Sequence, residues 1–174
     1  LVIALRTERE LELMVEANRI VGEAHRALAP LVNAGVKTKE LDEIAEEIIR
    51  SQGAEPAFKG YHGYPATICI SINEQVVHGI PGDRALLDGD IVSIDIGSKY
   101  KGYYGDQAIT RAVGVISEDE QKLLRVTRES LFKGIEKAVA GGRLGDIGGS
   151  IQGWVEDHGF SVVRQFVGHG IGRK

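Results

Sequence analysis

Two aspartates lie close together in the sequence, each inside a segment that is otherwise typical of a β-strand. Asp95 occurs in VSIDIG and Asp106 in YYGDQAIT, and the polar stretch SKYKG between these segments predicts a turn. If the hairpin closes around Tyr100 and Lys101, Asp95 and Asp106 lie directly opposite each other on one side of the sheet. A β-bulge in either strand would change that register.

Two opposed carboxylates repel each other and are unfavourable to bury, so something must neutralise them. Strand alternation places Asp95 on the face opposite to its aliphatic neighbours. The residues leave several neutralising partners open: a shared proton, an Arg or Lys, a metal ion, or solvent on an exposed face beside Lys99, Lys101 or Arg111. Carboxylates with imidazole suit Mn, Fe, Co or Zn, and two bridging carboxylates suit a pair of such ions.

Histidines are the other candidate ligands in this chain. His78 and His169 each end an extended segment beside a glycine, and His62 has the same local character. Neutral imidazole is a common metal ligand, although a lone histidine is more often a hydrogen-bonded structural group. His25 and His158 lie within or at the end of predicted helices, and we expect them to be surface or helix-terminus residues.

The composition indicates one soluble globular domain over residues 1–174, since 43% of the residues are hydrophobic and 26% are charged. The net charge is −4 and no Lys/Arg block occurs, so we expect no direct nucleic-acid site. Cys69 is the only cysteine, which favours a reducing, cytoplasmic setting. No apolar run approaches the roughly 18 residues of a membrane span, so no membrane partner is expected.

The elements that must position these side chains fall into separate helical and strand blocks. Helices are predicted at 8–29, at 39–52, from Ser117 to Gly141, and near 146–158. Residues 54–115 predict antiparallel strands, and 160–172 predict a final strand. This order favours an α+β fold with helices packed on one face of a curved antiparallel sheet.

Three motifs, taken together and in this order, resemble the bacterial type I methionine aminopeptidases. They are GYHGYPATICISINEQVVHGIP, DGDIVSIDIGSKYKGYYGDQAIT and FVGHGIGR. The resemblance runs from the first predicted helix to the last residue, and it implies the pita-bread fold shared with creatinase and X-Pro dipeptidase. It also implies that residues 1–174 form the N-terminal two-thirds of the catalytic domain, with the C-terminal part of the fold missing.

The resemblance implies two divalent metal ions, of Co, Mn, Fe or Zn. The metal ligands that it implies in this chain are Asp95, Asp106 and His169. The family has two further glutamate ligands and a second substrate-contacting histidine, and all three belong to a region that follows the position of Lys174.

The resemblance also implies a substrate site. His78 would contact the substrate and assist proton transfer, and His62 would lie at the rim of the site. Tyr64 and Cys69 would line the pocket for a methionine side chain. Phe58 occupies a further pocket position where relatives often have cysteine, so the pocket shape is expected to differ slightly. We expect Cys69 to be a packed pocket residue and not a nucleophile, because nothing near it in sequence reads as a paired base.

The function implied by the resemblance is removal of the initiator methionine from nascent proteins when the next residue is small, with a metal-bound hydroxide attacking the scissile carbonyl. The expected partners are the N-terminal Met of nascent polypeptides and the ribosome, and the expected state is a monomer. Two alternatives remain open at this point: a catalytically incompetent, truncated pita-bread module that acts in binding, and an X-Pro peptidase on the same fold.

Overall fold

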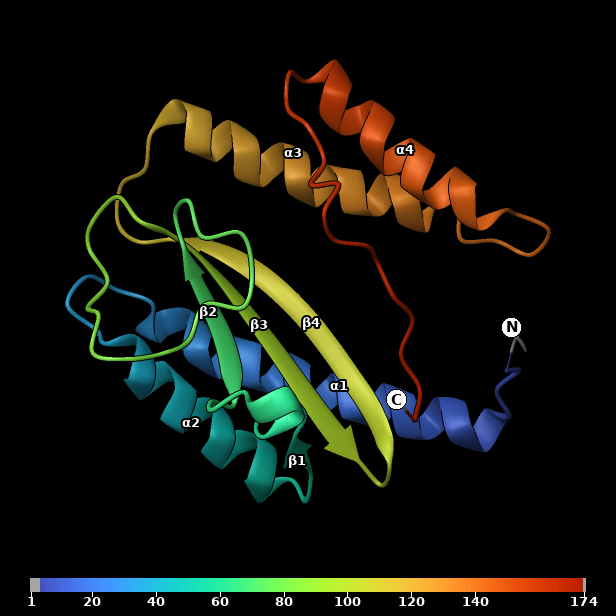
Figure 1. The fold of residues 1–174 in the computed structure, drawn as a ribbon, viewed down its shortest axis with the longest axis horizontal. Helices are drawn as coiled ribbons and strands as arrows, with labels where there is room; N and C mark the ends of the chain where they lie inside the picture. The colour runs from blue at the N-terminus through green and yellow to red at the C-terminus, as the bar shows by residue number, and fades with distance from the viewer. Residues whose placement is uncertain (1–3, 174) are drawn as a thin grey trace. The chain divides into compact units, whose positions relative to one another are not determined.

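The computed structural model describes residues 4–173, which fold into two compact units (Figure 1). The first, here called the sheet unit, consists of residues 4–116 and 170–173, and the second, the helical unit, of residues 117–169. The sheet unit contains α1 (Glu8–Leu28), η1 (Ala29–Leu31), α2 (Thr38–Ser51), β1 (Glu55–Pro56), η2 (Tyr61–Gly63), β2 (Ile68–Ile72), β3 (Ile91–Tyr100) and β4 (Tyr103–Ala112). The helical unit contains α3 (Glu118–Ile135) and α4 (Leu144–Asp157), which pack against each other.

Helix starts follow from local capping chemistry. Thr7 caps α1: its Oγ1 accepts a hydrogen bond from Glu10 N, and Glu10 Oε2 accepts one from Thr7 N at 2.9 Å. Ser117 and Glu120 form the same capping box at the start of α3. Both boxes confirm the helix starts predicted from the sequence.

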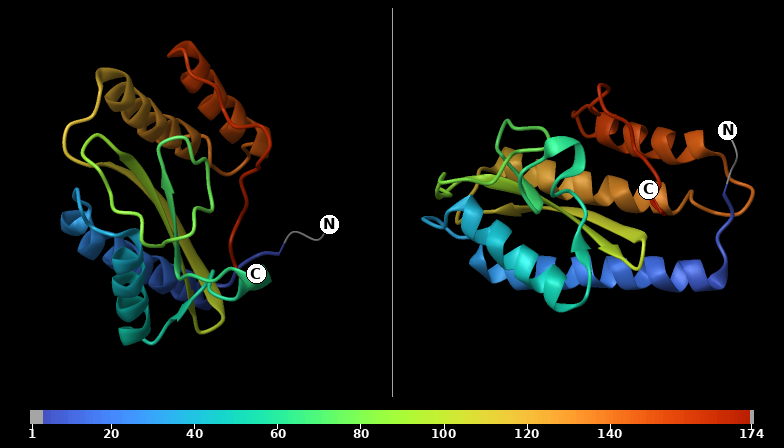
Figure 2. Two further views of the ribbon diagram at one scale, coloured as in Figure 1. Left: turned by 60° about the vertical axis from the view of Figure 1, so that its left-hand side comes forward. Right: turned by 60° about the horizontal axis from the view of Figure 1, so that its bottom comes forward.

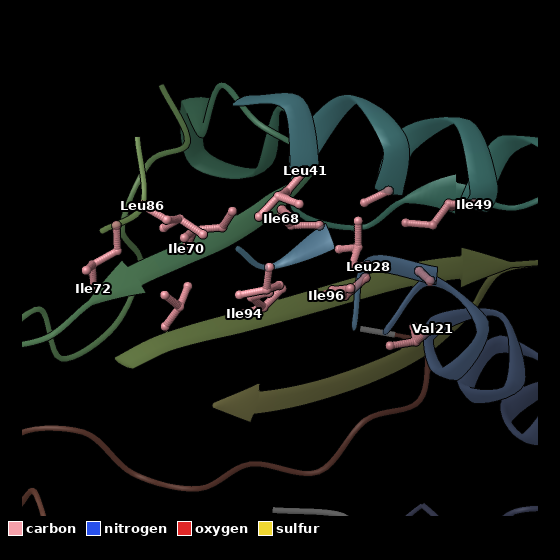
Figure 3. Close-up of a cluster of buried hydrophobic side chains, with 14 of the residues drawn as sticks. Val21, Leu28, Leu41, Ile49, Ile68, Ile70, Ile72, Leu86, Ile94 and Ile96 are labelled. Atoms are coloured by element: carbon pink, nitrogen blue, oxygen red, sulfur yellow. The ribbon is translucent and has the colours of Figure 1, made fainter. Parts of the chain in front are cut away.

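The hydrophobic core of the sheet unit lies between one face of the sheet and the two helices α1 and α2 (Figures 1 and 2). Alternate residues of the central strand, Val92, Ile94 and Ile96, are fully buried on this face. Figure 3 shows the isoleucines of β2 and β3 meeting aliphatic side chains of the helices, among them Leu28 and Leu41. The expectation of helices packed on one face of an antiparallel sheet is confirmed for α1 and α2.

β3 is the central strand of the sheet. It pairs with β4 along its whole length on one side, and with β1 and β2 one after the other on the other side, always antiparallel. The β3–β4 hairpin carries both aspartates, so its register decides how they meet.

The predicted register of this hairpin is wrong by two residues. Tyr100 pairs with Tyr103, and the turn consists of Lys101 and Gly102, which have φ angles of 48° and 84°. Positive φ at both central residues is the type I′ geometry that matches the twist of a two-residue hairpin, and glycine favours it. Because the error is two residues and side chains alternate with period two, every side chain stays on its predicted face.

Two other boundaries differ from the sequence prediction. Residues 160–173, predicted as a strand up to 172, contain none, and the bond from Tyr104 N to Gly172 O is where this segment meets β4. The α3 helix ends at Ile135 and continues as turns toward Gly141. None of the helices in residues 4–173 has the length and apolar character needed to cross a membrane.

α1 lies close against β4 beside Asp106. Gly105 permits this approach, since a Cβ there would lie 2.5 Å from the backbone carbon of Ala17. Asn18 Oδ1 accepts a hydrogen bond from Asp106 N at 3.3 Å, and Gln107 Nε2 donates to Asn18 O at 3.0 Å. The backbone that carries Asp106 is therefore held by the helix behind it.

His25, predicted as a surface residue, is buried at 2% exposure. The face of α1 that carries it turns toward β4, and its Nε2 lies 2.9 Å from Gln107 O, an acceptor, so Nε2 donates. Its Nδ1 has no hydrogen-bond partner among residues 4–173. Burial lowers the pKa of His25, and the positive charge of Arg111 lowers this pKa further.

We expect folding stability to fall as the pH drops below the ordinary histidine pKa of 6.5. The lowered pKa means that folded His25 stays neutral while the unfolded chain takes up a proton, so stability is fully present above 6.5 and is lost as the pH falls toward the folded-state pKa. Urea unfolding between about pH 8 and pH 5 measures this. His25→Gln, which keeps a donor for Gln107 O, should lose less stability over the same range. Parallel curves for the two proteins would contradict the assignment.

Candidate functional site

The face of the sheet that points away from the core, here called the polar face, carries the candidate site. In register, Cys69 of β2 lies beside Asp95, Asp95 lies beside Ala108, and Gly97 lies beside Asp106. Alternation from these pairs assigns the remaining side chains to the same face. The polar face thus consists of Glu55 on β1, Cys69 and Ser71 on β2, Ile91, Ser93, Asp95, Gly97 and Lys99 on β3, and Tyr104, Asp106, Ala108, Thr110 and Ala112 on β4.

Asp95 and Asp106 are diagonal neighbours on this face. Diagonal positions of an antiparallel pair have separations of about 7–8 Å, closer than isolated surface charges but wider than a directly opposed pair. Both side chains are partly buried, and Oδ1 of Asp95 is fully buried. This burial argues against two freely solvated carboxylates. Two partly buried negative charges at this spacing suit a divalent cation between them, and hard oxygen donors are the chemistry that such a cation prefers.

Cys69 is the neighbour of Asp95 on β2, and it is 5% exposed. Burial raises the pKa of the Cys69 thiol, and the negative charges of Asp95 and Asp106 raise this pKa further. The thiol is therefore protonated near neutral pH and is not an activated nucleophile. The expectation of a packed cysteine beside the carboxylate pair agrees with its burial and its charge environment.

Phe58 lies over the polar face at Gly97, the residue opposite Asp106. A Cβ added to Gly97 would overlap the Phe58 ring and would lie 2.9 Å from the Cβ of Ala57. Glycine at this strand position therefore makes room for an aromatic ring directly beside the carboxylates.

Tyr64 ties the segment after β2 to the strand itself. Its Oη lies 3.0 Å from both Ile68 O and Gly79 O, and burial raises the pKa of Tyr64 well above its usual range. Gly79 is held further by a bond from Ile70 N to Gly79 O at 2.8 Å and by its own donation to Ser71 Oγ at 3.1 Å. A Cβ at Gly79 would overlap Ile70 O, so only glycine fits against the strand edge here.

His78 precedes this clamped glycine, and it has a φ of 60°, in the left-handed region. His62 has a φ of 47° within η2. Both side chains are exposed, and both residues adopt a backbone conformation that is unfavourable for any residue except glycine and, to a lesser degree, Asn, Asp and His. Strained positions of this kind are concentrated at binding and catalytic sites.

The structure brings the two aspartates together but does not by itself assemble the three predicted ligands. His169 is the last residue of the helical unit, whereas Asp95 and Asp106 belong to the sheet unit. Within residues 4–173, no three His, Cys, Asp or Glu side chains lie close enough together to hold a metal ion on their own. The inclusion of His169 in the ligand set therefore stays a prediction.

Sequence reasoning missed two glycines of this site. Gly97 makes room for the Phe58 ring, and Gly79 is held against the edge of β2 by hydrogen bonds. A glycine inside a strand pattern signals a close approach of another group, and that signal was present at Gly97. At Gly79 the motif itself contained the glycine, but the strand edge that it contacts is known only from the fold.

The chain was compared with known proteins. The model of "Metallopeptidase family M24" matches residues 12–174. The chain belongs to this family. A methionine aminopeptidase 1 from Bacillus subtilis is 56% identical to this M24 chain over 171 residues, which are 98% of this chain and 69% of the relative. The resemblance drawn from the three sequence motifs is confirmed.

Solved structures agree with this assignment. A crystal structure of methionine aminopeptidase from Rickettsia prowazekii matches with a TM-score of 0.97 and 40% identity, and the match covers 99% of the M24 chain and 70% of that chain. A prolidase from Pyrococcus furiosus matches at a TM-score of 0.85 with 24% identity, which shows a shared fold alone. The pita-bread fold, with helices on an antiparallel sheet, is thereby confirmed, whereas the predicted division into one N-terminal two-thirds domain stays a prediction.

We expect Gly97→Ala to destabilise the protein by about 1–3 kcal/mol, the usual effect of overpacking. The added methyl group would collide with Phe58, so the loss should shrink when Phe58→Ala is combined with it in a double-mutant cycle. Urea unfolding of the four proteins measures both effects.

Gly148→Ala in α4 is the matched control, since nothing lies within 4 Å of its added Cβ. This substitution should be neutral or stabilising by up to about 1 kcal/mol, because alanine has the higher helix propensity. An equal loss from Gly97→Ala with and without Phe58 would show that the ring does not rest on Gly97.

Proposed function

We propose that this protein removes the N-terminal methionine from polypeptides in a metal-dependent reaction, when the following residue is small. The observation that carries the proposal is the pair of partly buried carboxylates, Asp95 and Asp106, on the polar face of a family M24 fold. The name of the Bacillus subtilis relative, at 56% identity, supports methionine as the residue removed.

In the proposed site, Asp95, Asp106 and His169 would hold two divalent ions, of Co, Mn, Fe or Zn. The donor set fits such ions, because it combines hard carboxylate oxygens with imidazole. A divalent ion at this position supplies Lewis-acid polarisation of the scissile carbonyl and activation of water. Asn18 supports the site from behind, since it fixes the backbone N–H of Asp106.

His169 is included because the chain that follows it is anchored near Asp106. Tyr104 N donates to Gly172 O at 2.8 Å, and Tyr104 lies two residues before Asp106 on β4. Gly172 lies three residues after His169, and three residues extend at most about 11 Å. Two strand residues span about 7 Å. His169 belongs to the helical unit, so its inclusion in the ligand set rests on the sequence motif FVGHGIGR and on this connection along the chain.

The proposed substrate pocket combines Phe58, Cys69 and Tyr64. A protonated thiol and an aromatic ring beside the carboxylates form a soft, apolar wall, which suits the unbranched thioether of methionine. Tyr64 supports the pocket by holding Gly79, so that His78 emerges from a fixed backbone toward the substrate. His62 forms the rim. In this arrangement His78 orients the scissile peptide and transfers a proton during its hydrolysis.

The proposal includes the finer expectations that accompany this activity. The substrate is the N-terminus of a nascent chain, the enzyme works beside the ribosome in the cytoplasm, and it acts as a monomer. The shared fold with prolidase makes an X-Pro substrate the natural comparison in any assay.

We expect the purified protein, supplied with Mn²⁺ or Co²⁺, to release methionine from a Met-Ala-Ser peptide and to leave an Ala-Pro dipeptide intact. Asp106→Asn should lower the rate by about 100-fold or more, because removing a ligand forfeits several kcal/mol of transition-state stabilisation. Released methionine is quantified by chromatography. The metal should also raise the melting temperature of the wild-type protein, and it should not raise that of Asp106→Asn.

Asp119→Asn, an exposed aspartate in the first turn of α3, is the matched control and should behave as the wild type in both assays. Without metal, Asp106→Asn should be at least as stable as the wild type, because it removes a like-charge repulsion. A wild-type protein that binds metal but releases no methionine would refute the proposed substrate. Release from Ala-Pro alone would favour the X-Pro peptidase.

A further inference from the structure

The segment that carries Phe58 and Tyr64, residues 57–67 and here called the pocket loop, connects β1 to β2 within the sheet unit. Its interior is closed by turn bonds, such as that from Gly60 N to Tyr64 O at 2.8 Å. Its tip is exposed, and Tyr61 there is 68% exposed. Because a loop with so little buried surface opens easily, its position depends on how its two ends are held.

Glu46 on α2 holds both ends of the pocket loop through one oxygen. Its Oε2 accepts a hydrogen bond from Lys59 Nζ at 2.6 Å, near the start of the loop, and one from Thr67 Oγ1 at 3.1 Å, at its end. The other oxygen, Oε1, accepts from Arg50 Nε at 2.8 Å, which fixes the orientation of the carboxylate. The bond from Lys59, and after it the bond from Arg50, lower the pKa of Glu46 to about 2, so the group is charged at neutral pH.

Asp42, one helical turn before Glu46, holds the junction between the loop and β2. Its Oδ1 accepts hydrogen bonds from Thr67 N and from Ile68 N, both at 2.9 Å. Both donor residues are fully buried, so their N–H groups have no alternative partner in solvent. Asp42 and Glu46 are four residues apart and therefore lie on one face of α2. These two carboxylates are here called the α2 anchor.

The pocket loop meets the polar face beside Cys69. Phe58 lies over Gly97, two positions along β3 from the residue that pairs with Cys69. Tyr64 Oη lies 3.0 Å from the carbonyl oxygen of Ile68, the residue before Cys69 in β2. The α2 anchor holds the two ends of the loop from which these side chains extend, so it sets how far apart they lie.

We propose that Asp42 and Glu46 are positioning residues that hold the pocket loop in the shape that selects methionine over a branched side chain. This inference rests on the proposed function, in which Phe58, Tyr64 and Cys69 line the pocket for methionine. The two carboxylates belong to α2, which packs against the opposite face of the sheet, so they act on the substrate only through the loop. Leucine has nearly the volume of methionine but branches at Cγ, so the shape of the pocket must distinguish the two.

The test removes the donors to Glu46 one at a time. Lys59→Met removes the donor at the start of the loop, and Thr67→Val removes the hydroxyl group at its end with little change in volume. The measured quantity is the ratio of kcat/KM for Met-Ala-Ser to kcat/KM for Leu-Ala-Ser. We expect Thr67→Val to lower this ratio by about 10-fold, within the range that one contact in a hydrophobic pocket contributes. Lys59→Met should lower it by less, because its ion pair is partly exposed. KM for Met-Ala-Ser should rise while kcat stays near that of the wild type.

Labelling of Cys69 by iodoacetamide reports the position of the loop without turnover. Cys69 is the only cysteine and is 5% exposed, so it reacts when its surroundings open. We expect labelling to be about 10-fold faster in Thr67→Val, the shift that follows the loss of a hydrogen bond to a charged group. Lys59→Met should show a smaller increase. The rates are measured by mass spectrometry at one fixed pH.

Further variants make the test specific. Glu47→Gln, beside the anchor on the exposed side of α2, should leave the peptide ratio and the labelling rate unchanged. Lys59→Arg keeps a cationic donor for Glu46, and it should restore most of the selectivity that Lys59→Met loses. Asp42→Asn keeps an oxygen acceptor for Thr67 N, so its peptide ratio should stay closer to the wild type than that of Asp42→Ala. Lys59 is exposed, so its substitution leaves the core intact even if Thr67→Val perturbs folding.

Each remaining outcome overturns the proposal in a recognisable way. Unchanged labelling in Thr67→Val and Lys59→Met would show that the α2 anchor does not hold the loop. Faster labelling with a wild-type peptide ratio would show that the loop is anchored but does not set the selection. A wild-type protein that releases no methionine would refute the proposed function and the positioning role with it, while its labelling rates would still measure the anchoring of the loop.

Discussion

Repulsion between the carboxylates of Asp95 and Asp106 is the main constraint on the polar face of the sheet, because this face must offset two negative charges. The two residues are diagonal neighbours, both partly buried, in a sheet whose other face is closed by α1 and α2. A charge pair of this kind is unfavourable unless a cation, a proton or a donor offsets it. Burial raises the pKa of the Cys69 thiol beside this pair, and the negative charges of both carboxylates raise this pKa further.

The backbone around this pair is fixed by close approaches that only glycine permits. Gly105 lets α1 reach β4 behind Asp106, Gly97 lets the Phe58 ring lie beside it, and Gly79 lets the segment carrying His78 press against β2. Each approach is reinforced by a hydrogen bond or a packed ring. The site is thus built by close approaches of backbone at Gly79 and Gly105 and of an aromatic ring at Gly97, so small changes at these glycines should be felt at the carboxylates.

The two exposed histidines add strain to this arrangement. His62 and His78 both adopt positive φ, which costs of order 1–3 kcal/mol at each position and persists only where the surroundings demand it. At His78 the demand comes from the clamp on Gly79, whose carbonyl oxygen receives two donors. The strain therefore marks His78 as a residue whose backbone conformation is imposed by the fold.

Local chemistry was readable from the sequence, and so was the face on which each strand residue lies. Capping boxes at Thr7 and Ser117 depend on residues three apart, and alternation along β3 depends on neighbours, so neither needs the rest of the fold. The three motifs, in their order, also identified the family, which the comparisons confirmed.

Tertiary structure alone determined which residues that are far apart in the sequence come into contact. The hairpin register depended on whether Lys101 accepts a positive φ, and the burial of His25 depended on which side of α1 faces β4. The loop form of residues 160–169 could not be foreseen either, because a strand pattern becomes a strand only where a ladder partner exists. The sequence by itself determined which chemical groups are available and on which face of the sheet each strand residue lies. Packing determined which of these groups share a site, because contact between residues distant in sequence is set by the whole fold.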